Sequence, residues 1–310
     1  MAESLMDIKR QIASTKKTGQ ITQAMQMVSG SKLSQIEKRS SAYQLYANKV
    51  REIVTHLAAA QLLEIERQQS EALQAGAGVS AERLQVANLL AERPVKKTGY
   101  LVITSDRGLV GGYNSTILKA MMQMFTDDHK DKDDFVIMAV GGTGADFFKS
   151  RGLNLAYEYR GVSDIPTFDE VREIVKTAVT MFDNGVFDEL YVCYNHHVNS
   201  LTSAFRAEKM LPITDLDVAE VADANIEYLT EPDPDAVLEA ILPQYAESLI
   251  FGAIMDAKTA EHAASTTAMK SATDNANDLI SRLSVTYNRA RQAQITTEIT
   301  EIVGGANALA

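Results

Sequence analysis

A glycine-rich loop in the middle of the chain carries the residue types most suggestive of ligand chemistry. Gly108, Gly111 and Gly112 follow a short apolar run and precede a helix-like segment, where backbone amides can cradle a phosphate. Their spacing matches neither G-x-G-x-x-G nor the P-loop pattern, and no Gly-Lys dipeptide occurs in the chain. We therefore expect no nucleotide site in this loop and no cofactor.

Side chains that could hold a metal or transfer protons are scattered. His196 and His197 are adjacent, so on a strand they point to opposite faces and cannot chelate one ion. Ser105-Asp106-Arg107 has no histidine at a catalytic spacing, and we interpret it as a turn with an Asp–Arg pair. The remaining histidines, which have no visible partners, are His56, His129 and His262. The sequence predicts neither a metal centre nor catalytic residues.

Composition and charge narrow the class of protein. The net charge of −11 argues against nucleic acid as a partner. Basic residues gather in the first part of the chain, at Lys9, Arg10, Lys16, Lys17, Lys32, Lys38 and Arg39. A solvated helix face is the simple interpretation of this cluster, and contact with an acidic partner is the alternative.

Several features indicate a cytoplasmic protein that does not enter the membrane. The first 20 residues lack the apolar stretch of a signal peptide. The most apolar run, Val54 to Ile65, is too short to cross a bilayer. The single cysteine, Cys193, cannot form an internal disulfide, fits a reducing compartment, and lies in a run typical of a buried strand.

The two ends of the chain are expected to form long helices, which would position any site. All six prolines lie between Pro94 and Pro243, so both ends can form long helices. Apolar or small residues alternate in steps of three and four at Ile36, Ser40, Tyr43, Ala47, Val50, Val54 and Leu57. The same alternation picks out Ala246, Ile250, Ala253, Ala257, Ala260, Ala264, Thr267 and Ser271, and then Leu279, Leu283, Thr286, Ala290, Ala293 and Thr297. We expect one antiparallel coiled coil of these helices; two long helices of an ordinary all-α domain are the alternative.

Strands and helices alternate between the two ends, which favours a layered α/β domain. Strands are expected at 100–104, 135–140, 189–194 and 203–210, and helices at 114–125, 145–150 and 167–182. Asn114 or Ser115 is expected to cap the first helix and Thr167 the third. Asp233 and Pro234 mark the start of the last long helix, with a kink expected near Pro243.

Four strings of the sequence carry a family resemblance. They are ITQAMQMVSGSKL (Ile21 to Leu33), ITSDRGLVGGYN (Ile103 to Asn114), ATDNANDLI (Ala272 to Ile280) and YNRARQAQITTEITEIVGGANAL (Tyr287 to Leu309). Together they resemble the gamma subunit of bacterial F-type ATP synthase. The resemblance implies an α/β fold in which a long antiparallel coiled coil of the N- and C-terminal helices carries an inserted Rossmann-like domain.

The resemblance also implies a division of the chain and a function. The implied parts are an N-terminal shaft helix (1–67), a helical or mobile linker (68–98), the Rossmann-like domain (99–230) and a C-terminal shaft helix (231–310). The implied function is that of a central rotating stalk, which transmits torque between the membrane c-ring and the alpha/beta hexamer. The partners would be the alpha, beta and epsilon subunits and the c-ring, at the cytoplasmic face of the membrane. The chain itself would be non-catalytic, with no cofactor, no nucleic acid and no direct membrane insertion.

The resemblance assigns partner contacts to particular residues. Arg291, Gln292 and Thr296 fall where family members meet a loop of the beta subunit. Met25 falls near the beta lever region, and Tyr228 and Glu231 match the foot that faces the c-ring.

The chain departs from the family pattern at three places. Gly30 stands where alanine is common, Val110 replaces a frequent cysteine, and the segment 68–93 is longer than in many relatives. Two other functions are kept as alternatives. One is a nucleotide-binding α/β regulatory protein with coiled-coil arms, and the other is a scaffold protein that homodimerises through its heptads.

Overall fold

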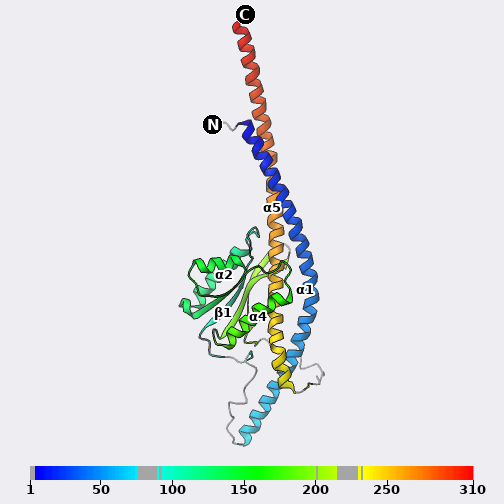
Figure 1. Cartoon of the computed structure of the whole chain (residues 1–310), viewed down its shortest axis with the longest axis vertical. Helices are drawn as coiled ribbons and strands as arrows, with labels where there is room; N and C mark the ends of the chain where they lie inside the picture. Colours follow the sequence, from blue (N-terminus) through cyan, green and yellow to red (C-terminus); the bar gives the residue numbers. More distant parts are fainter. Residues whose placement is uncertain are drawn as a thin grey trace. The chain divides into compact units, whose positions relative to one another are not determined.

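The computed structural model describes residues 4–75, 89–90, 93–199, 202–214, 230–231 and 233–309. The elements are α1 (Leu5–Ala75), β1 (Thr98–Ile103), α2 (Tyr113–Asp128), η2 (Lys132–Asp134), β2 (Phe135–Val140), α3 (Gly142–Ser150), β3 (Leu155–Tyr159), α4 (Phe168–Asp183), β4 (Glu189–Asn199), β5 (Thr202–Leu211) and α5 (Pro234–Leu309) (Figure 1). The chain divides into two compact units. The terminal unit comprises Met1–Ser31 and Ser265–Ala310, and the central unit comprises Lys32–Ala264.

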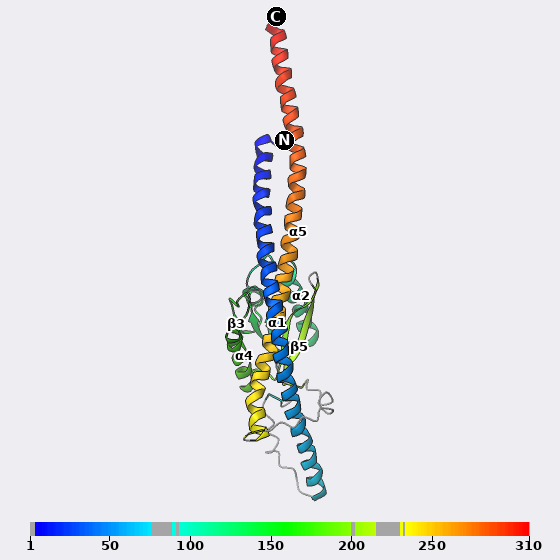
Figure 2. The same cartoon turned by 90° about the vertical axis from the view of Figure 1, so that its right-hand side faces the viewer.

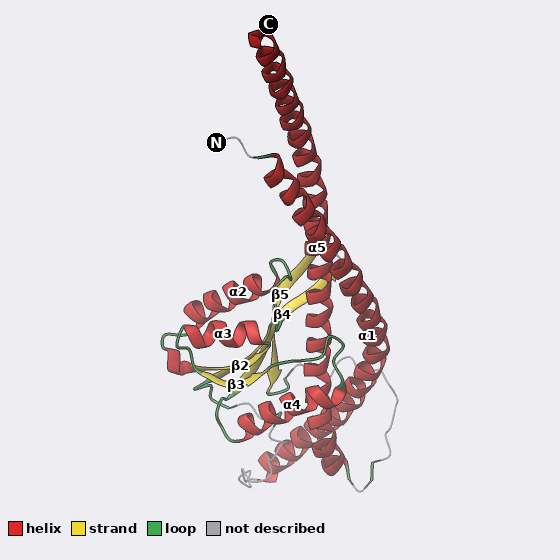
Figure 3. Ribbon diagram, turned by 45° about the horizontal axis from the view of Figure 1, so that its top comes forward, coloured by secondary structure: helices red, strands yellow, loops and turns green. Residues whose placement is uncertain are grey.

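The central unit contains a five-stranded sheet in the order β3-β2-β1-β4-β5 (Figure 3). Strand β1 pairs in parallel with both β2 and β4, and β2 pairs in parallel with β3. Strand β5 runs antiparallel to β4. The four strands predicted from the sequence are confirmed within a few residues. Strand β3 was not predicted, because its alternating half-buried and exposed residues are those of an edge strand rather than an apolar run.

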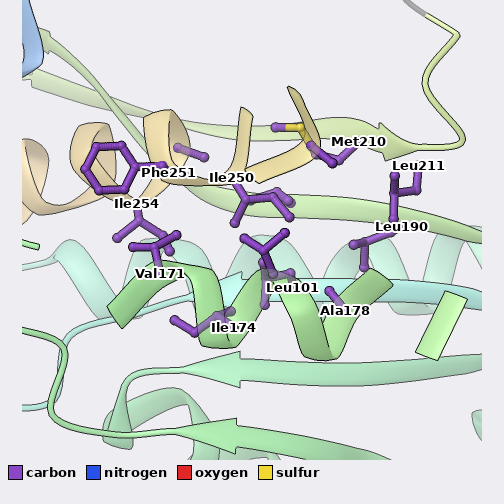
Figure 4. Close-up of a cluster of buried hydrophobic side chains, with 14 of the residues drawn as sticks. Leu101, Val171, Ile174, Ala178, Leu190, Met210, Leu211, Ile250, Phe251 and Ile254 are labelled. Carbon is purple, nitrogen blue, oxygen red and sulfur yellow. The ribbon is translucent and has the colours of Figure 1, made fainter. Parts of the chain in front are cut away.

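Helices cover both faces of this sheet. On one face Tyr100 and Val102 of β1 join a core with α2 and α3. On the other face Leu101 and Ile103 join a larger core with α4, α5 and the middle of α1. Figure 4 shows residues of this second core, where Val171 and Ile174 of α4 lie beside the sheet and α5. Burial from both sides explains why β1 and β2 are buried throughout and mainly apolar.

Within the central unit, the predicted inward-facing row of α1 is confirmed. Ile36, Val50, Val54 and Leu57 are buried, and the residues between them in the row are half-buried. The Tyr43 hydroxyl donates a hydrogen bond of 2.7 Å to the Ser248 carbonyl oxygen of α5. The predicted row of α5 is buried from Ala246 to Ala260 and half-buried at Ala264, but other sides of this stretch are buried as well, because α5 also packs against α4 and the sheet.

In the terminal unit, α1 and α5 form an antiparallel pair. Thr22 and Thr273 join through their hydroxyls at 2.7 Å, and Ser29 and Ser265 at 3.0 Å. A Cβ added at Gly19 would lie 3.4 Å from the Ala276 Cβ. These contacts confirm the antiparallel coiled coil and fix its register.

The predicted α5 row of the terminal unit is partly wrong. Ser271, Thr286, Ala293 and Thr297 are exposed, and Leu279 is 47% exposed. The inward-facing positions are Met269, Thr273, Ala276, Ile280, Leu283, Tyr287 and Ala290. The prediction followed Leu279 because it is large, whereas the contact with Gly19 requires a small residue, Ala276.

Helix starts agree with the sequence in two cases out of three. Thr167 forms a capping box with Glu170, and the Asp233 carboxylate accepts a hydrogen bond from the Ala236 amide at 2.8 Å. The predicted cap of α2 is wrong, because Gly112 precedes that helix without a side-chain bond. Pro243 lies inside α5, and the kink there stays a prediction.

The proposed division into four segments also stays a prediction. Helix α1 continues to Ala75, eight residues beyond the expected end of the first segment. About half of the expected linker, 76–88 and 91–92, lies outside the described residues.

Candidate functional surfaces

In the glycine-rich loop after β1, the side chain of Asp106 accepts hydrogen bonds from backbone amides of two later segments. The Asp106 oxygens accept hydrogen bonds from the Gly142 amide at 2.9 Å and the Gly161 amide at 3.0 Å. Gly142 begins α3, so its amide lies at the positive end of that helix, where a phosphate would bind. The Asp106 carboxylate already accepts hydrogen bonds from these amides, and its negative charge would repel a phosphate.

The rest of the loop is fixed by short-range polar contacts. The Ser105 amide donates to Asn114 Oδ1 at 3.0 Å, and Asn114 Nδ2 donates to Ser105 Oγ at 2.7 Å. The predicted turn is therefore correct, but the partners of Asp106 are amides rather than Arg107. At the end of β2, Gly141 has φ of +105°, and a Cβ there would lie 2.2 Å from the Thr104 carbonyl oxygen, so only glycine fits.

The histidines have partners that are distant in sequence. His196 Nδ1 lies 2.5 Å from a carboxylate oxygen of Asp256 on α5. His129 Nε2 lies 2.8 Å from the Tyr100 hydroxyl. Across the described part of the chain, no three side chains of His, Cys, Asp or Glu are grouped to hold a metal ion. Burial raises the pKa of the Cys193 thiol well above its ordinary value, so this thiol is unreactive.

A charged cluster lies where the loop before α4 meets α1 and α5 in the central unit. Lys32 forms an ion pair with Asp164, and His262 Nε2 lies 3.2 Å from the Asp164 carbonyl oxygen. Burial alone would raise the pKa of Asp164, but the hydrogen bond and charge of Lys32 outweigh it and lower that pKa. Burial lowers the pKa of His262, although the Glu261 carboxylate opposes the shift. No sequence pattern indicated this cluster, because its members come from three separate segments.

The end of α5 presents a fully exposed surface. From Arg291 to Asn307 every described side chain is exposed, Gln292 and Thr296 included. The register set by Thr22 and Thr273 places the start of α1 opposite Ala290, so α5 continues beyond its partner helix (Figure 2). The large apolar residues of this extension are Ile295, Ile299, Ile302 and Val303.

The other predicted contact residues are Met25, Tyr228 and Glu231. Met25 is half-buried on α1 of the terminal unit, and Glu231 is exposed just before α5. Tyr228 lies outside the described residues. The three residues Arg291, Gln292 and Thr296 are thus brought together on one helix end, where the Thr296 hydroxyl donates to the Gln292 carbonyl oxygen at 2.9 Å.

Comparisons with known proteins agree along the whole chain. A family model described as ATP synthase matches residues 4–309. The chain is 80% identical over 309 residues to the ATP synthase gamma chain of Lacticaseibacillus paracasei, covering 100% of both chains. It is 62% identical over 309 residues to that of Enterococcus faecalis, again covering 100% of both.

Solved structures share the fold at lower identity. The central stalk and c-ring structure of Tetrahymena thermophila mitochondrial ATP synthase contains a chain with a TM-score of 0.56 and 20% identity, covering 81% of this chain and 99% of that one. A chain of Euglena gracilis mitochondrial ATP synthase has a TM-score of 0.53 and 16% identity, covering 90% and 95%.

Proposed function

Because the chain belongs to the ATP synthase gamma chain family, we propose that it is the central rotating stalk of an F-type ATP synthase. In this role it carries torque between an ion-driven c-ring and an alpha/beta catalytic hexamer. The observation that best supports the proposal is the extension of α5 beyond its partner helix, with exposed apolar side chains along it.

The part of α5 beyond Ala290 is a single exposed helix, and such a helix needs partner subunits around it to be stable. Isolated helices of about 12–15 residues are marginal in water, and contiguous exposed apolar surface marks a binding site. The residues beyond Ala290 include Ile295, Ile299 and Ile302, which are exposed and, at spacings of four and three residues, lie on one side of the helix. A surrounding sleeve of alpha and beta subunits would cover this apolar side of the helix.

We assign the partner contacts as follows. Arg291, Gln292 and Thr296 would meet a loop of the beta subunit, because all three are exposed on the extension. Met25 would lie near the beta lever region. Glu231, exposed ahead of α5, and Tyr228 would belong to the foot that faces the c-ring.

The chain itself would make and break no bonds, and the complex would work at the cytoplasmic face of the membrane. Asp106 supports the first point, since its carboxylate holds the amides that a nucleotide phosphate would need. Helix α5 contains a window long and apolar enough to cross a bilayer, half of it buried in the protein. A buried helix of a water-soluble protein meets the same test, so we propose peripheral attachment through the c-ring.

Purification of the tagged full chain from its own host tests this function. Alpha, beta, epsilon and c subunits should co-purify with it, and the complex should hydrolyse ATP. Calorimetry separates the alternative of a nucleotide-binding regulator. Purification without these subunits, together with stoichiometric ATP binding by the chain alone, would favour that regulator.

A further inference from the structure

The hairpin of β4 and β5 extends beyond the rest of the sheet. Strand β4 pairs with β1 only from Glu189 to Cys193, yet it pairs with β5 as far as Asn199. We call residues 194–199 and 202–206 the free ribbon. Figure 3 shows β4 and β5 projecting past the other strands. A two-stranded ribbon is marginally stable on its own, so something else must hold it.

Apolar packing anchors only the base of the free ribbon. Tyr194 is buried, and the Asn195 side chain donates to the Tyr113 carbonyl oxygen at 3.0 Å. Further out, Val198 is 55% exposed, and Asn199 and the described residues of β5 up to Ala204 are exposed as well. From His196 outward, no described side chain of the ribbon is an apolar anchor.

Asp256 of α5 ties the outer ribbon to the helix. One carboxylate oxygen lies 2.5 Å from His196 Nδ1, and the other accepts the His197 backbone N–H at 3.0 Å. Both side chains of the Asp256–His196 pair are about one-quarter to one-third exposed, so water screens the pair only in part. A carboxylate that accepts two hydrogen bonds from neighbouring residues fixes the position and the direction of the strand.

A groove beside this tie separates the ribbon from α1. It has a volume of about 570 Å³ and is lined by Gln44 and Asn48 of α1, Arg206 of the ribbon and Gly252 of α5, among others. Gly252 contributes no side chain to this space. His196, His197 and Asp256 also line this groove, so the Asp256 contacts join the ribbon to α5 at its wall.

We propose that Asp256 is a positioning residue of the rotor: its carboxylate holds the free ribbon against α5, so that the ribbon turns with the helix. This inference rests on the proposed function, because it concerns a part that moves within a complex. Without the tie the ribbon pivots about its base, and its exposed end drags on neighbouring subunits as α5 turns.

Hydrogen exchange on the full chain tests the structural half of the proposal. In Asp256→Ala, the amides of residues 196–199 and 202–204 should exchange roughly 10- to 100-fold faster, as expected for loss of charge-assisted hydrogen bonds. Asp256→Asn keeps the shape and an acceptor for the His197 amide but loses the negative charge, so its exchange should fall between that of the wild type and that of Asp256→Ala. His196→Gln gives a second variant on the exposed side of the contact and should loosen the same amides.

Glu247→Ala is the matched control, because Glu247 is another carboxylate of α5 that faces the α/β domain, 3.7 Å from Arg172 of α4. Glu247 contacts α4 and not the ribbon, and α4 is held by its own buried apolar residues. Exchange in the ribbon should therefore not change in Glu247→Ala. Wild-type exchange in the ribbon of Asp256→Ala overturns the proposal. Faster exchange throughout the sheet also overturns it, because the residue would then be a general stabiliser.

ATP turnover by the reconstituted complex tests the rotary half. Asp256→Ala should lower turnover, and Asp256→Asn should recover part of it. If the wild-type chain forms no active complex, the proposed function fails while the exchange result still stands. If the wild-type complex is active and Asp256→Ala turns over ATP equally fast, this inference fails alone.

Discussion

A disulfide between the two helices of the terminal unit gives a sharp test of their register. In the double variant Gly19→Cys, Ala276→Cys the two Cβ atoms would start about 3.4 Å apart, close to the roughly 3.5–4.5 Å of natural disulfides. The bond would close a loop of roughly 258 residues, and the chain-entropy estimate gives up to about 5 kcal/mol of stabilisation. Native Cys193 is buried and its raised pKa keeps it out of the reaction.

Non-reducing electrophoresis and peptide mass spectrometry would report the bond in dilute, mildly oxidised protein, and denaturation with and without reductant would report the stabilisation. The control is Gly19→Cys, Leu279→Cys, since Leu279 is 47% exposed and lies outside the observed row. We expect an intrachain bond in the first variant only. Bonds only between chains would indicate a homodimeric coiled coil, and equal bonding by both variants would refute the register.

Substitutions at single positions test three other features of the chain. Gly30→Ala should stabilise the chain by up to about 1 kcal/mol in urea unfolding, since a Cβ there has nothing within 4 Å; destabilisation would refute this. Because burial lowers the pKa of His262, its contribution to stability is complete above about pH 6.5 and is lost as the pH falls below that. His262→Gln should flatten this slope in melting curves, and an unchanged slope would contradict the assignment. Replacing both Arg291 and Gln292 by alanine should leave circular dichroism unchanged and slow ATP turnover of the complex; unchanged turnover removes them from the coupling.

Features carried by local pattern could be predicted from the sequence. The absence of proline at both ends, the heptads of α1 and the apolar runs of β1, β2 and β4 each depend on neighbours a few residues apart. The Thr167 cap was visible because its partner, Glu170, lies three residues away. The edge strand β3 was missed because one side of it is solvated, which removes the apolar run.

Contacts between distant segments could not be predicted in this way. Asp106 was expected to pair with its neighbour, but its partners Gly142 and Gly161 follow it by 36 and 55 residues. The Asp256–His196 contact spans 60 residues. Periodicity shows which side of a strand or helix is buried, yet it does not show which segment buries it.

The row of residues between α1 and α5 changes character along the pair. In the central unit Val50, Val54 and Leu57 bury large side chains. In the terminal unit Ile8 is buried as well, and small or hydroxyl-bearing residues meet beside it, as at Gly19 with Ala276 and at Thr22 with Thr273. Small and polar residues at such positions bury less apolar area, but they bring the backbones close and favour one register. In the terminal pair these small and polar contacts therefore fix the register, in addition to the apolar burial at Ile8. The exposed apolar side chains beyond Ala290, Ile295 among them, are not covered by the described fold, which is what the proposed shaft within other subunits requires.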